Sequence, residues 1–468
     1  MNGGRVMRRL LAVLVSLPMA ACGAPEDGYD EEADQGWRPG GKADEAGEPL
    51  RYQSYDVLFT NPLCREYGYG ESVKTADGSR TLTTKPKNVY CSSADVAASA
   101  SRPSSPQHKL LSWLEPLGAE DEVFLAYLSF SNRVVADRLC ELAEAGTKVT
   151  FVLDKPTEQS NRIQACGATV LIRGNVGSIG YAHNKVILIN PHGDSAYMKM
   201  TFSSGNMSSG VVTHHENWHF VDVARDSYFA QSHVCLMDAQ VGEESSSGRT
   251  QYRDALDACR GAIAAEEESD IKAFFIPHTN DRKRAKSYML NAVGEAKEID
   301  LGAHRFGHTD LVRKLEQGLA GGELTVRMVA DDDLYWVAPD AGEPLESSNM
   351  EFEAVNVAKL EAAGGDAFEI RYLETNHREH LLHHNKYLVY RDGDGTPWGV
   401  LAGAANLTKA GFNDNFENIY FIKVPAVLDA FAAQMARVWD GEKASPDEQD
   451  PPIATPRHLM PERDVAGQ

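Results

Sequence analysis

Two short segments of this sequence carry the same three polar residues in the same order. The tripeptide His-Asn-Lys occupies residues 183–185, before the apolar run VILIN, and residues 384–386, before YLVYR. An imidazole can act as a nucleophile or as an acid–base group near neutral pH, and an ammonium group can hold an anionic oxygen. Alternation along a strand places residues two apart on the same face. Each segment therefore predicts a histidine and a lysine side by side at the start of a strand.

Matched asparagine and glutamate residues follow each tripeptide. Asn206 lies in SSGNMSSG and Asn406 in GAANLTKAG, while Glu216 and Glu417 open the strand-like segments ENWHFVDV and ENIYFIKV. The offset between the copies is 201 residues for the histidines and the glutamates and 200 for the asparagines. One His-x-Lys pair arises easily by chance, whereas two in register with Asn and Glu do not. A carboxylate beside an imidazole fixes its tautomer and supports its charged form.

A repeated plan of strands and helices surrounds these residues. Residues 122–154 and 298–331 each read as an apolar strand, a phenylalanine, an amphipathic helix ending at glycine, and a second strand closing on aspartate. This order predicts an α/β fold with mixed, largely parallel sheets flanked by helices. We expect two tandem repeats, residues 51–245 and 265–440, packed as a pseudo-dimer that forms one cleft on a pseudo-twofold axis.

The paired motif resembles that of the phospholipase D superfamily, His-x-Lys-x4-Asp followed by a Gly/Ser-x-Asn turn and an acidic residue. The resemblance covers roughly residues 55–440 and includes both copies. It implies a phosphodiesterase without metal or cofactor, whose single active site is formed by both halves. One histidine would attack phosphorus, with the first copy favoured for this role, and the other would protonate the leaving oxygen. The resemblance assigns the catalytic and phosphate-binding roles to His183, Lys185, Asn206, Glu216, His384, Lys386, Asn406 and Glu417.

The sequence departs from the family pattern at three positions. The aspartate expected seven residues after each histidine is Asn190 in the first copy and Arg391 in the second, and Ala404 replaces the serine of the second turn. In the family this carboxylate mainly supports the motif rather than touching phosphate, so its loss does not abolish the mechanism. An inactive relative remains an alternative, although degenerate copies usually lose the histidine or the lysine, and neither is lost here.

Charge bears on the substrate. The chain has 68 Asp and Glu against 46 Lys and Arg, a formal net charge of −22. An acidic surface repels a phosphate backbone, which disfavours a stable nucleic-acid complex. We therefore expect a phospholipid substrate and a reaction that hydrolyses the phosphatidyl ester or transfers the phosphatidyl group to an alcohol, carried out by a monomer. The alternatives are an endonuclease of the same superfamily and a catalytically silent envelope binding protein.

The N-terminal segment predicts export. Residues 1–21 combine arginines with a short apolar run, as in a bacterial secretion signal. The ending Met-Ala-Ala-Cys resembles a lipobox, which predicts lipid attachment at Cys22 and anchoring to a membrane of the bacterial cell envelope. Residues 22–50 are acidic and glycine-rich, which predicts a disordered tether, and residues 441–468 are expected to form a flexible tail.

The cysteine count fits an exported protein. Seven cysteines are present, and six remain once Cys22 carries lipid. Pairing of sequence neighbours is the simplest of the roughly 15 possible arrangements, and buried free thiols are the alternative. The expected disulfides join Cys64 to Cys91, Cys140 to Cys166, and Cys235 to Cys259.

One motif competes with this interpretation. Residues 215–219 read His-Glu-Asn-Trp-His and match a zinc-protease signature. That signature requires a helix, on which residues four apart are about 6 Å apart along the axis. The segment alternates like a strand, on which four residues span roughly 13 Å, so no zinc site is expected from these two histidines.

Overall fold

The computed structural model describes residues 47–60, 72–74, 81–83, 93–174, 180–243, 249–336, 348–373, 382–442 and 454–460. The expected signal peptide, Cys22, most of the tether and the Cys64–Cys91 pair lie outside these ranges. Within them, no helix combines the length and the apolar character needed to span a membrane.

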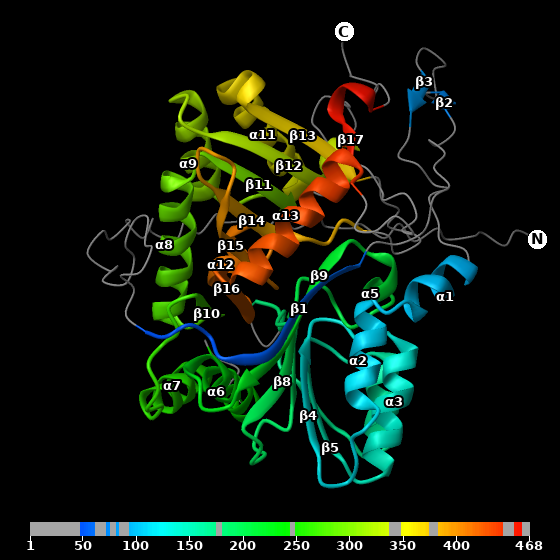
Figure 1. The fold of residues 1–468 in the computed structure, drawn as a ribbon. Helices are drawn as coiled ribbons and strands as arrows, with labels where there is room; N and C mark the ends of the chain where they lie inside the picture. Colours follow the sequence, from blue (N-terminus) through cyan, green and yellow to red (C-terminus); the bar gives the residue numbers. More distant parts are fainter. Residues whose placement is uncertain are drawn as a thin grey trace, which may run out of the picture. The chain divides into compact units, whose positions relative to one another are not determined.

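Two mixed sheets form the framework (Figure 1). The described strands of the first lie in the order β1-β9-β8-β7-β4-β5-β6, and those of the second in the order β10-β16-β15-β14-β11-β12-β13-β17. The two orders correspond strand for strand, with β17 added at one edge, so the repeat expected from the sequence is present in the topology. The strands of the first sheet are β1 (Tyr52–Thr60), β4 (Glu122–Tyr127), β5 (Lys148–Leu153), β6 (Thr169–Ile172), β7 (Val186–Ile189), β8 (Tyr197–Ser203) and β9 (Glu216–Ala224). Those of the second are β10 (Ile271–Ile276), β11 (Glu298–Ala303), β12 (Thr325–Asp331), β13 (Phe368–Leu373), β14 (Lys386–Arg391), β15 (Pro397–Gly403), β16 (Glu417–Ile422) and β17 (Thr455–Pro456).

The expectation of largely parallel pairing is wrong. Among the described strands, only β4, β5 and β6 in the first sheet, and β11, β12 and β13 in the second, pair in parallel. The remaining neighbours in both sheets are antiparallel. Parallel pairing needs a crossover connection, and helices supply one only between these strands. The strands that follow each tripeptide are joined by short connections and pair antiparallel with their neighbours.

Helices cover both sheets. Those of the first half are α1 (Ser93–Ser101), α2 (Pro106–Leu114), α3 (Arg133–Glu144), α4 (Glu158–Ala165), α5 (Gly210–Thr213), α6 (Tyr228–Gly242) and α7 (Thr250–Gly261). Those of the second half are α8 (Thr279–Glu295), α9 (Thr309–Ala320), α10 (Asp333–Trp336), α11 (Ser348–Gly364), α12 (Lys409–Asn413) and α13 (Pro425–Asp440). Short 3-10 turns at Gly365–Ala367 and Arg457–Leu459 and a small hairpin of β2 (Ser72–Lys74) and β3 (Thr81–Thr83) complete the described elements.

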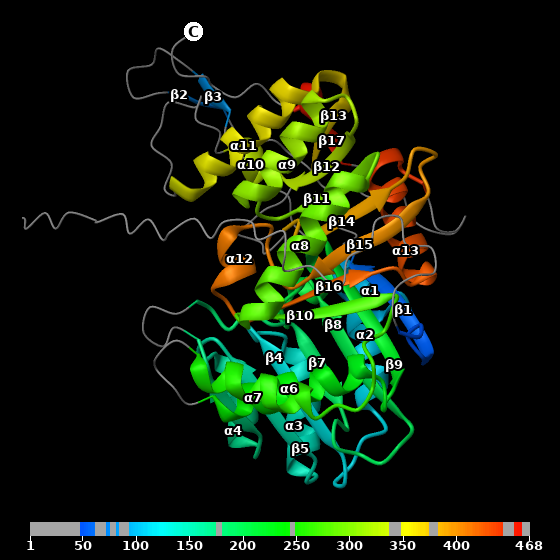
Figure 2. The same ribbon diagram turned by 90° about the vertical axis from the view of Figure 1, so that its left-hand side faces the viewer.

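The described residues form three main hydrophobic cores, which lie between the sheets and the helices that cover them. One lies between the first sheet and α2 and α3, and another between the second sheet and α8, α9 and α11 (Figures 1 and 2). The third contains residues of both sheets together with α6, α7 and α13. In it, the rings of Phe202 from β8 and Tyr420 from β16 stack with centroids 3.9 Å apart. This shared core holds the two repeats against each other.

The repeats also share their helix boundaries. The side chain of Asn132 accepts a hydrogen bond from the N–H of Val135 at the start of α3, and His308 caps α9 in the same way. After these helices, Gly146 and Gly322 adopt φ values of 100° and 68°, a region that favours glycine. The glycines expected at the helix ends therefore terminate both helices.

The boundaries of the tether and the tail differ from expectation. Leu50, assigned to the tether, is buried, and its N–H donates to Asp270 Oδ1 at 2.7 Å. Thr455 and Pro456, assigned to the tail, pair with β13 as β17. An apolar side chain near the tether's end and an unpaired strand edge explain why these short pieces join the fold.

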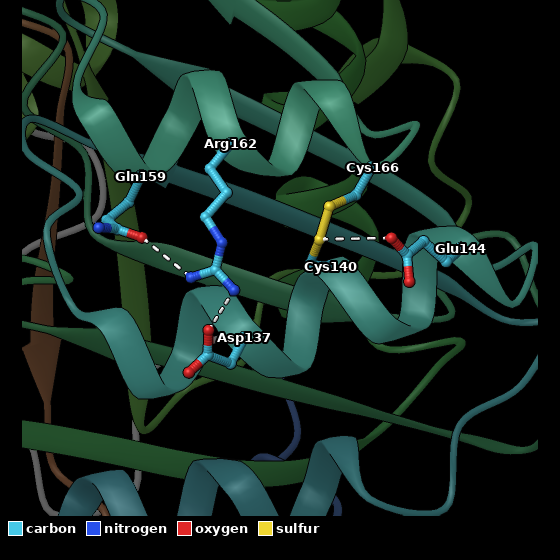
Figure 3. The surroundings of a disulfide bond; sticks show 6 residues. All are labelled: Asp137, Cys140, Glu144, Gln159, Arg162 and Cys166. Atoms are coloured by element: carbon cyan, nitrogen blue, oxygen red, sulfur yellow. Dashed lines mark hydrogen bonds and ion pairs between the residues drawn. A yellow bond between two sulfur atoms is a disulfide. The ribbon is translucent and has the colours of Figure 1, made fainter.

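Two of the three expected disulfides lie among the described residues, and both are confirmed. Cys140 of α3 bonds to Cys166 at the end of α4, and Cys235 of α6 bonds to Cys259 of α7. Figure 3 shows the first of these joining two helices that run side by side, with an ion pair between Arg162 and Asp137 beside it. The first bridge closes a helix pair within the first repeat, and the second joins the last helix of that repeat to α7, which lies between the two repeats.

Candidate active site

The two His-Asn-Lys segments lie at the starts of equivalent strands. Residues 183–185 lead into β7, and residues 384–386 lead into β14, the strand at the same place in the second sheet. All six side chains are buried, and the two lysines are 0% and 1% exposed. A buried ammonium group is costly unless its charge is balanced, so this burial indicates a site built for an anionic partner.

His183 of the first repeat lies beside the glutamate of the second. Ala182 forms a parallel bridge with Phe416, and the N–H of His183 donates to the carbonyl of Phe416 at 2.9 Å. This register brings His183 Nδ1 to 2.7 Å from Glu417 Oε2. The other oxygen of Glu417 accepts a hydrogen bond from Asn415 Nδ2 at 2.9 Å. A carboxylate in this position keeps the proton on Nδ1 and leaves Nε2 as the reactive nitrogen.

The reciprocal contact joins His384 to the first repeat. His383 bridges His215, and the N–H of His384 donates to the carbonyl of His215 at 2.9 Å. His384 Nδ1 then lies 3.2 Å from Glu216 Oε1. The second oxygen of Glu216 accepts from Trp218 Nε1 at 3.2 Å. The structure thus places each histidine against the glutamate of the other repeat, so the site is composite.

Asparagine pairs beside the glutamates tie the two repeats together. Asn217 Nδ2 donates to Asn385 Oδ1 at 2.9 Å, and Asn418 lies 3.4 Å from Asn184 through their side chains. Asn418 Oδ1 also accepts the backbone N–H of Lys185 at 2.8 Å. The sequence-based interpretation missed these positioning residues, although the dipeptide Glu-Asn at the start of both strands was the available signal.

Asn206 and Asn406 lie in turns held by the loops after β4 and β11. The residue after Asn206 bridges Phe130, and the residue after Asn406 bridges Phe306. The phenylalanines found in both copies therefore anchor the two turns. Among the described residues, the side-chain oxygens of both asparagines are buried without a hydrogen-bond partner. These oxygens can accept a hydrogen bond, whereas the predicted role of binding phosphate oxygens would use the amide N–H groups.

An aspartate at the end of β5 and another at the end of β12 fix the backbone just before the two histidines. Asp154 Oδ1 accepts the N–H of Ala182 at 2.9 Å, and Asp331 Oδ2 accepts the N–H of His383 at 3.0 Å. Both aspartates are buried. They act on the residue before each histidine, a role that the sequence pattern did not indicate.

The lysine ammonium groups contact backbone carbonyls. Lys185 Nζ donates to the carbonyl of His183 at 2.9 Å, and Lys386 Nζ to that of His384 at 2.7 Å and that of Ser204 at 3.2 Å. Burial lowers the pKa of Lys185 to about 8. Burial and, next, the Lys185 charge lower the pKa of Lys386 well below its usual value. An anionic group between the two lysines would relieve both effects.

Burial also lowers the pKa of both histidines. For His183, the nearby Glu417 carboxylate opposes this shift in pKa. For His384 the lysine and histidine neighbours add to burial, and the pKa falls well below its usual value. Both shifts in pKa favour neutral imidazoles, the form that can attack phosphorus.

Two of the three departures from the family pattern, Asn190 and Arg391, lie away from the histidines. Asn190 follows β7 and Arg391 ends β14, at the opposite ends of these strands from the tripeptides. Asn190 Oδ1 accepts the N–H of Glu122 at 2.7 Å. Arg391 pairs at 2.7 Å with Asp300, which is buried. Both replacements therefore have structural partners, and neither changes the contacts of the catalytic candidates.

The zinc-protease signature forms a strand. Residues 216–224 are β9, as the alternating pattern predicts. His219 Nδ1 hydrogen-bonds to the Tyr55 hydroxyl at 3.1 Å, whereas the ring of His215 lies near that of His383, with centroids 6.3 Å apart. The two histidines of the signature thus have separate surroundings.

Comparison with known proteins identifies one domain in the chain. Residues 289–439 match the family model described as cardiolipin synthase, PLD-like domain. A search of curated proteins finds no match.

The chain is similar to several solved structures. Phosphatidylserine synthase from Haemophilus influenzae Rd KW20 is 12% identical, with 70% of this chain and 84% of that chain covered and a TM-score of 0.48. The phospholipase D family member Nuc from Salmonella typhimurium is 17% identical over 36% of this chain and 93% of its own, with a TM-score of 0.27. Yeast tyrosyl-DNA phosphodiesterase is 10% identical over 65% and 85%, with a TM-score of 0.39.

Proposed function

We propose that this chain is a member of the phospholipase D superfamily, whose model matches residues 289–439, and that it cleaves the phosphodiester of a phospholipid through a phosphohistidine intermediate, without a metal ion. The phosphatidyl group then passes to water or to an alcohol. The observation that carries this proposal is the reciprocal pairing of His183 with Glu417 and of His384 with Glu216. This pairing brings two imidazoles into one buried site beside two lysines. One imidazole can attack phosphorus and the other can donate a proton.

The first chemical step forms a bond between His183 Nε2 and phosphorus and breaks the bond from phosphorus to the leaving oxygen. Positive charge develops on the imidazole, and Glu417, 2.7 Å from Nδ1, stabilises it. His384, protonated when the anionic substrate is bound, donates its proton to the leaving oxygen. The products are the released alcohol and a phosphorylated His183.

The second step returns the enzyme to its starting state. Neutral His384 accepts a proton from water or from an acceptor alcohol as the oxygen attacks phosphorus, and the bond from phosphorus to His183 breaks. Lys185, Lys386 and the two turn asparagines hold the nonbridging oxygens as charge redistributes through both steps. Burial of these donors strengthens their electrostatic interaction with the nonbridging oxygens.

The test measures product release by the purified mature protein in EDTA. The substrates are phosphatidylcholine vesicles, single-stranded DNA and bis-p-nitrophenyl phosphate, which separate a lipase from a nuclease and from a silent binding protein. Headgroup release that persists in EDTA and disappears in His183→Ala and in His384→Ala supports the proposal. The exposed His108→Ala serves as the matched control. Activity that EDTA abolishes, or that both active-site variants retain, would overturn it.

We also propose that the protein is exported and anchored by lipid at Cys22. The support is the sequence of residues 1–22. The Cys22→Ser variant, expressed in a bacterium that processes lipoproteins, should leave the membrane fraction and migrate without the mass of the lipid. Membrane association that persists unchanged would contradict the anchor.

A further inference from the structure

A third imidazole enters one half of the active site. His214 Nδ1 lies 3.1 Å from Glu216 Oε1, the same oxygen that lies 3.2 Å from His384 Nδ1. The centroids of the two imidazole rings are 5.7 Å apart. All three side chains are buried, with exposures of 6%, 0% and 5% in chain order. Two imidazole nitrogens and a carboxylate oxygen therefore converge in a space sheltered from solvent.

The spacing of these atoms suits a metal ion. The three donor atoms all lie within 4.8 Å of one another. The edge of a tetrahedron with metal–ligand bonds of about 2.0 Å is roughly 3.3 Å, close to both nitrogen–oxygen separations. Imidazole nitrogen and carboxylate oxygen are ligands that zinc, cobalt and nickel ions accept. Small side-chain adjustments would thus let the three residues supply three ligands of a tetrahedral site, with water as the fourth ligand.

Among the described residues, the hydrogen bonding of the three donor atoms stays within the cluster. In that part of the chain, His384 Nδ1 makes no hydrogen bond despite its distance to Glu216, and His214 Nδ1 hydrogen-bonds to Glu216 Oε1 at 3.1 Å. The other carboxylate oxygen of Glu216 is held by Trp218 Nε1 at 3.2 Å, which orients Oε1 toward the imidazoles. An outer group that holds a ligating carboxylate in this way is common at metal sites.

The other half of the active site lacks the third ligand. Asn415 stands where the first repeat has His214, and its amide donates to Glu417 at 2.9 Å. His183 makes a direct contact of 2.7 Å with that glutamate. An amide nitrogen is not a metal ligand, so this half keeps only one imidazole and one carboxylate. The convergence is therefore a property of one repeat.

We propose that His214, Glu216 and His384 bind a divalent transition-metal ion of the zinc type, and that the bound ion inhibits the enzyme. Binding displaces the proton from His384 Nδ1 to solvent and leaves a proton on Nε2. The ring can then no longer alternate between one proton and two, which the leaving-group step requires. The inhibitory effect rests on the proposed function, whereas the binding of metal does not.

The test titrates the chelator-treated mature protein with Co²⁺, whose tetrahedral complexes absorb visible light. The wild type is expected to bind one equivalent, and Zn²⁺ should displace it. His214→Asn, which installs the residue of the other repeat, should weaken cobalt binding by at least about tenfold. His215→Asn, which removes the adjacent buried histidine of the zinc-protease signature, should retain the absorption band. Circular dichroism checks that both variants fold.

Two outcomes overturn the proposal: no cobalt complex in the wild type, or a band that His214→Asn retains. X-ray absorption of the zinc-loaded wild type gives a measurement that needs no variant. It should show two imidazoles in the first coordination shell, and a shell without imidazole scattering would also overturn the site. Inhibition is read as the ratio of headgroup release with and without Zn²⁺ in each protein. If cobalt binds as described but no substrate is cleaved, the metal site stands and the proposed function fails.

Discussion

The two halves of the molecule share a strand order but differ in what surrounds their histidines. His183 has one close acidic partner, Glu417, which Asn415 supports from its other oxygen. His384 shares Glu216 with His214 and has further imidazoles near it, including that of His304, whose centroid is 4.7 Å from its own. Duplication thus preserved the backbone plan, whereas the polar environment diverged. We infer that His183 is the better-supported nucleophile, because a carboxylate committed to one imidazole stabilises its positive charge more strongly.

The sharpest way to test this difference is to neutralise each glutamate in turn. Glu417→Gln is expected to lower kcat by about 10²- to 10³-fold, because the proposed phosphorylated form of His183 would lose its charge partner. Glu216→Gln should cost roughly tenfold, because His384 makes no hydrogen bond to that carboxylate in the described structure. Steady-state kinetics on a soluble phosphodiester give both values, with His108→Ala as reference. Equal losses would remove the proposed distinction between the halves.

The disulfides predict a second difference, in stability. All seven cysteines precede residue 260, so the bridges strengthen the first repeat and the helix that follows it. Each described bridge spans 24 or 26 residues, and its removal should lower the free energy of unfolding by about 3 kcal/mol.

Urea unfolding of the double Ser variants of Cys140/Cys166 and Cys235/Cys259 measures the size of this loss. Hydrogen exchange then locates it. In each variant, the increase in exchange rate over the wild type is compared between strands. A larger increase in β11 and β12 than in β4 and β5 would show that the stabilisation is not confined to the first repeat.

A glycine beside Glu216 predicts a smaller effect on catalysis. A Cβ on Gly205 would lie 1.8 Å from a carboxylate oxygen of Glu216, whereas the second repeat already carries Ala405 at this place. Gly205→Ala should therefore displace Glu216 and lower kcat about tenfold. Ala405→Gly, the converse exchange, should leave kcat within about twofold. A crystal structure of the first variant with Glu216 unmoved and full activity would contradict this explanation.

The dependence of kcat/KM on pH is the prediction with the smallest expected effect near neutral pH. In the proposed mechanism the protonated form of Lys185 binds the anionic substrate. Burial lowers the pKa of Lys185 to about 8, so kcat/KM should fall as pH rises through that value, about tenfold per unit for one proton. Burial lowers the pKa of His183, which keeps the nucleophile neutral to a more acidic pH than an exposed histidine would allow. Lys185→Arg should move the alkaline limit upward, and a profile flat to about pH 10 in the original protein would contradict the assignment.

Much of the plan is readable in the amino-acid sequence. Spacing and alternation are local properties, and they indicated two repeats, the strands that carry the tripeptides and the strand conformation of residues 216–224. Neighbouring cysteines closed the helix pairs as expected for Cys140–Cys166 and Cys235–Cys259. A pattern found twice in register could also single out candidate residues without any structure.

The tertiary structure decided which of these residues meet. Antiparallel pairing depends on how strands are ordered in the sheet, which periodicity does not encode. The contacts of Asn217 and Asn418 depend on side-chain direction where the two repeats meet. The approach of His214 to His384 joins residues about 170 positions apart in the chain. Such contacts arise only when the shared core aligns two sheets, because the free energy that selects them comes from packing between segments rather than from the properties of either segment alone.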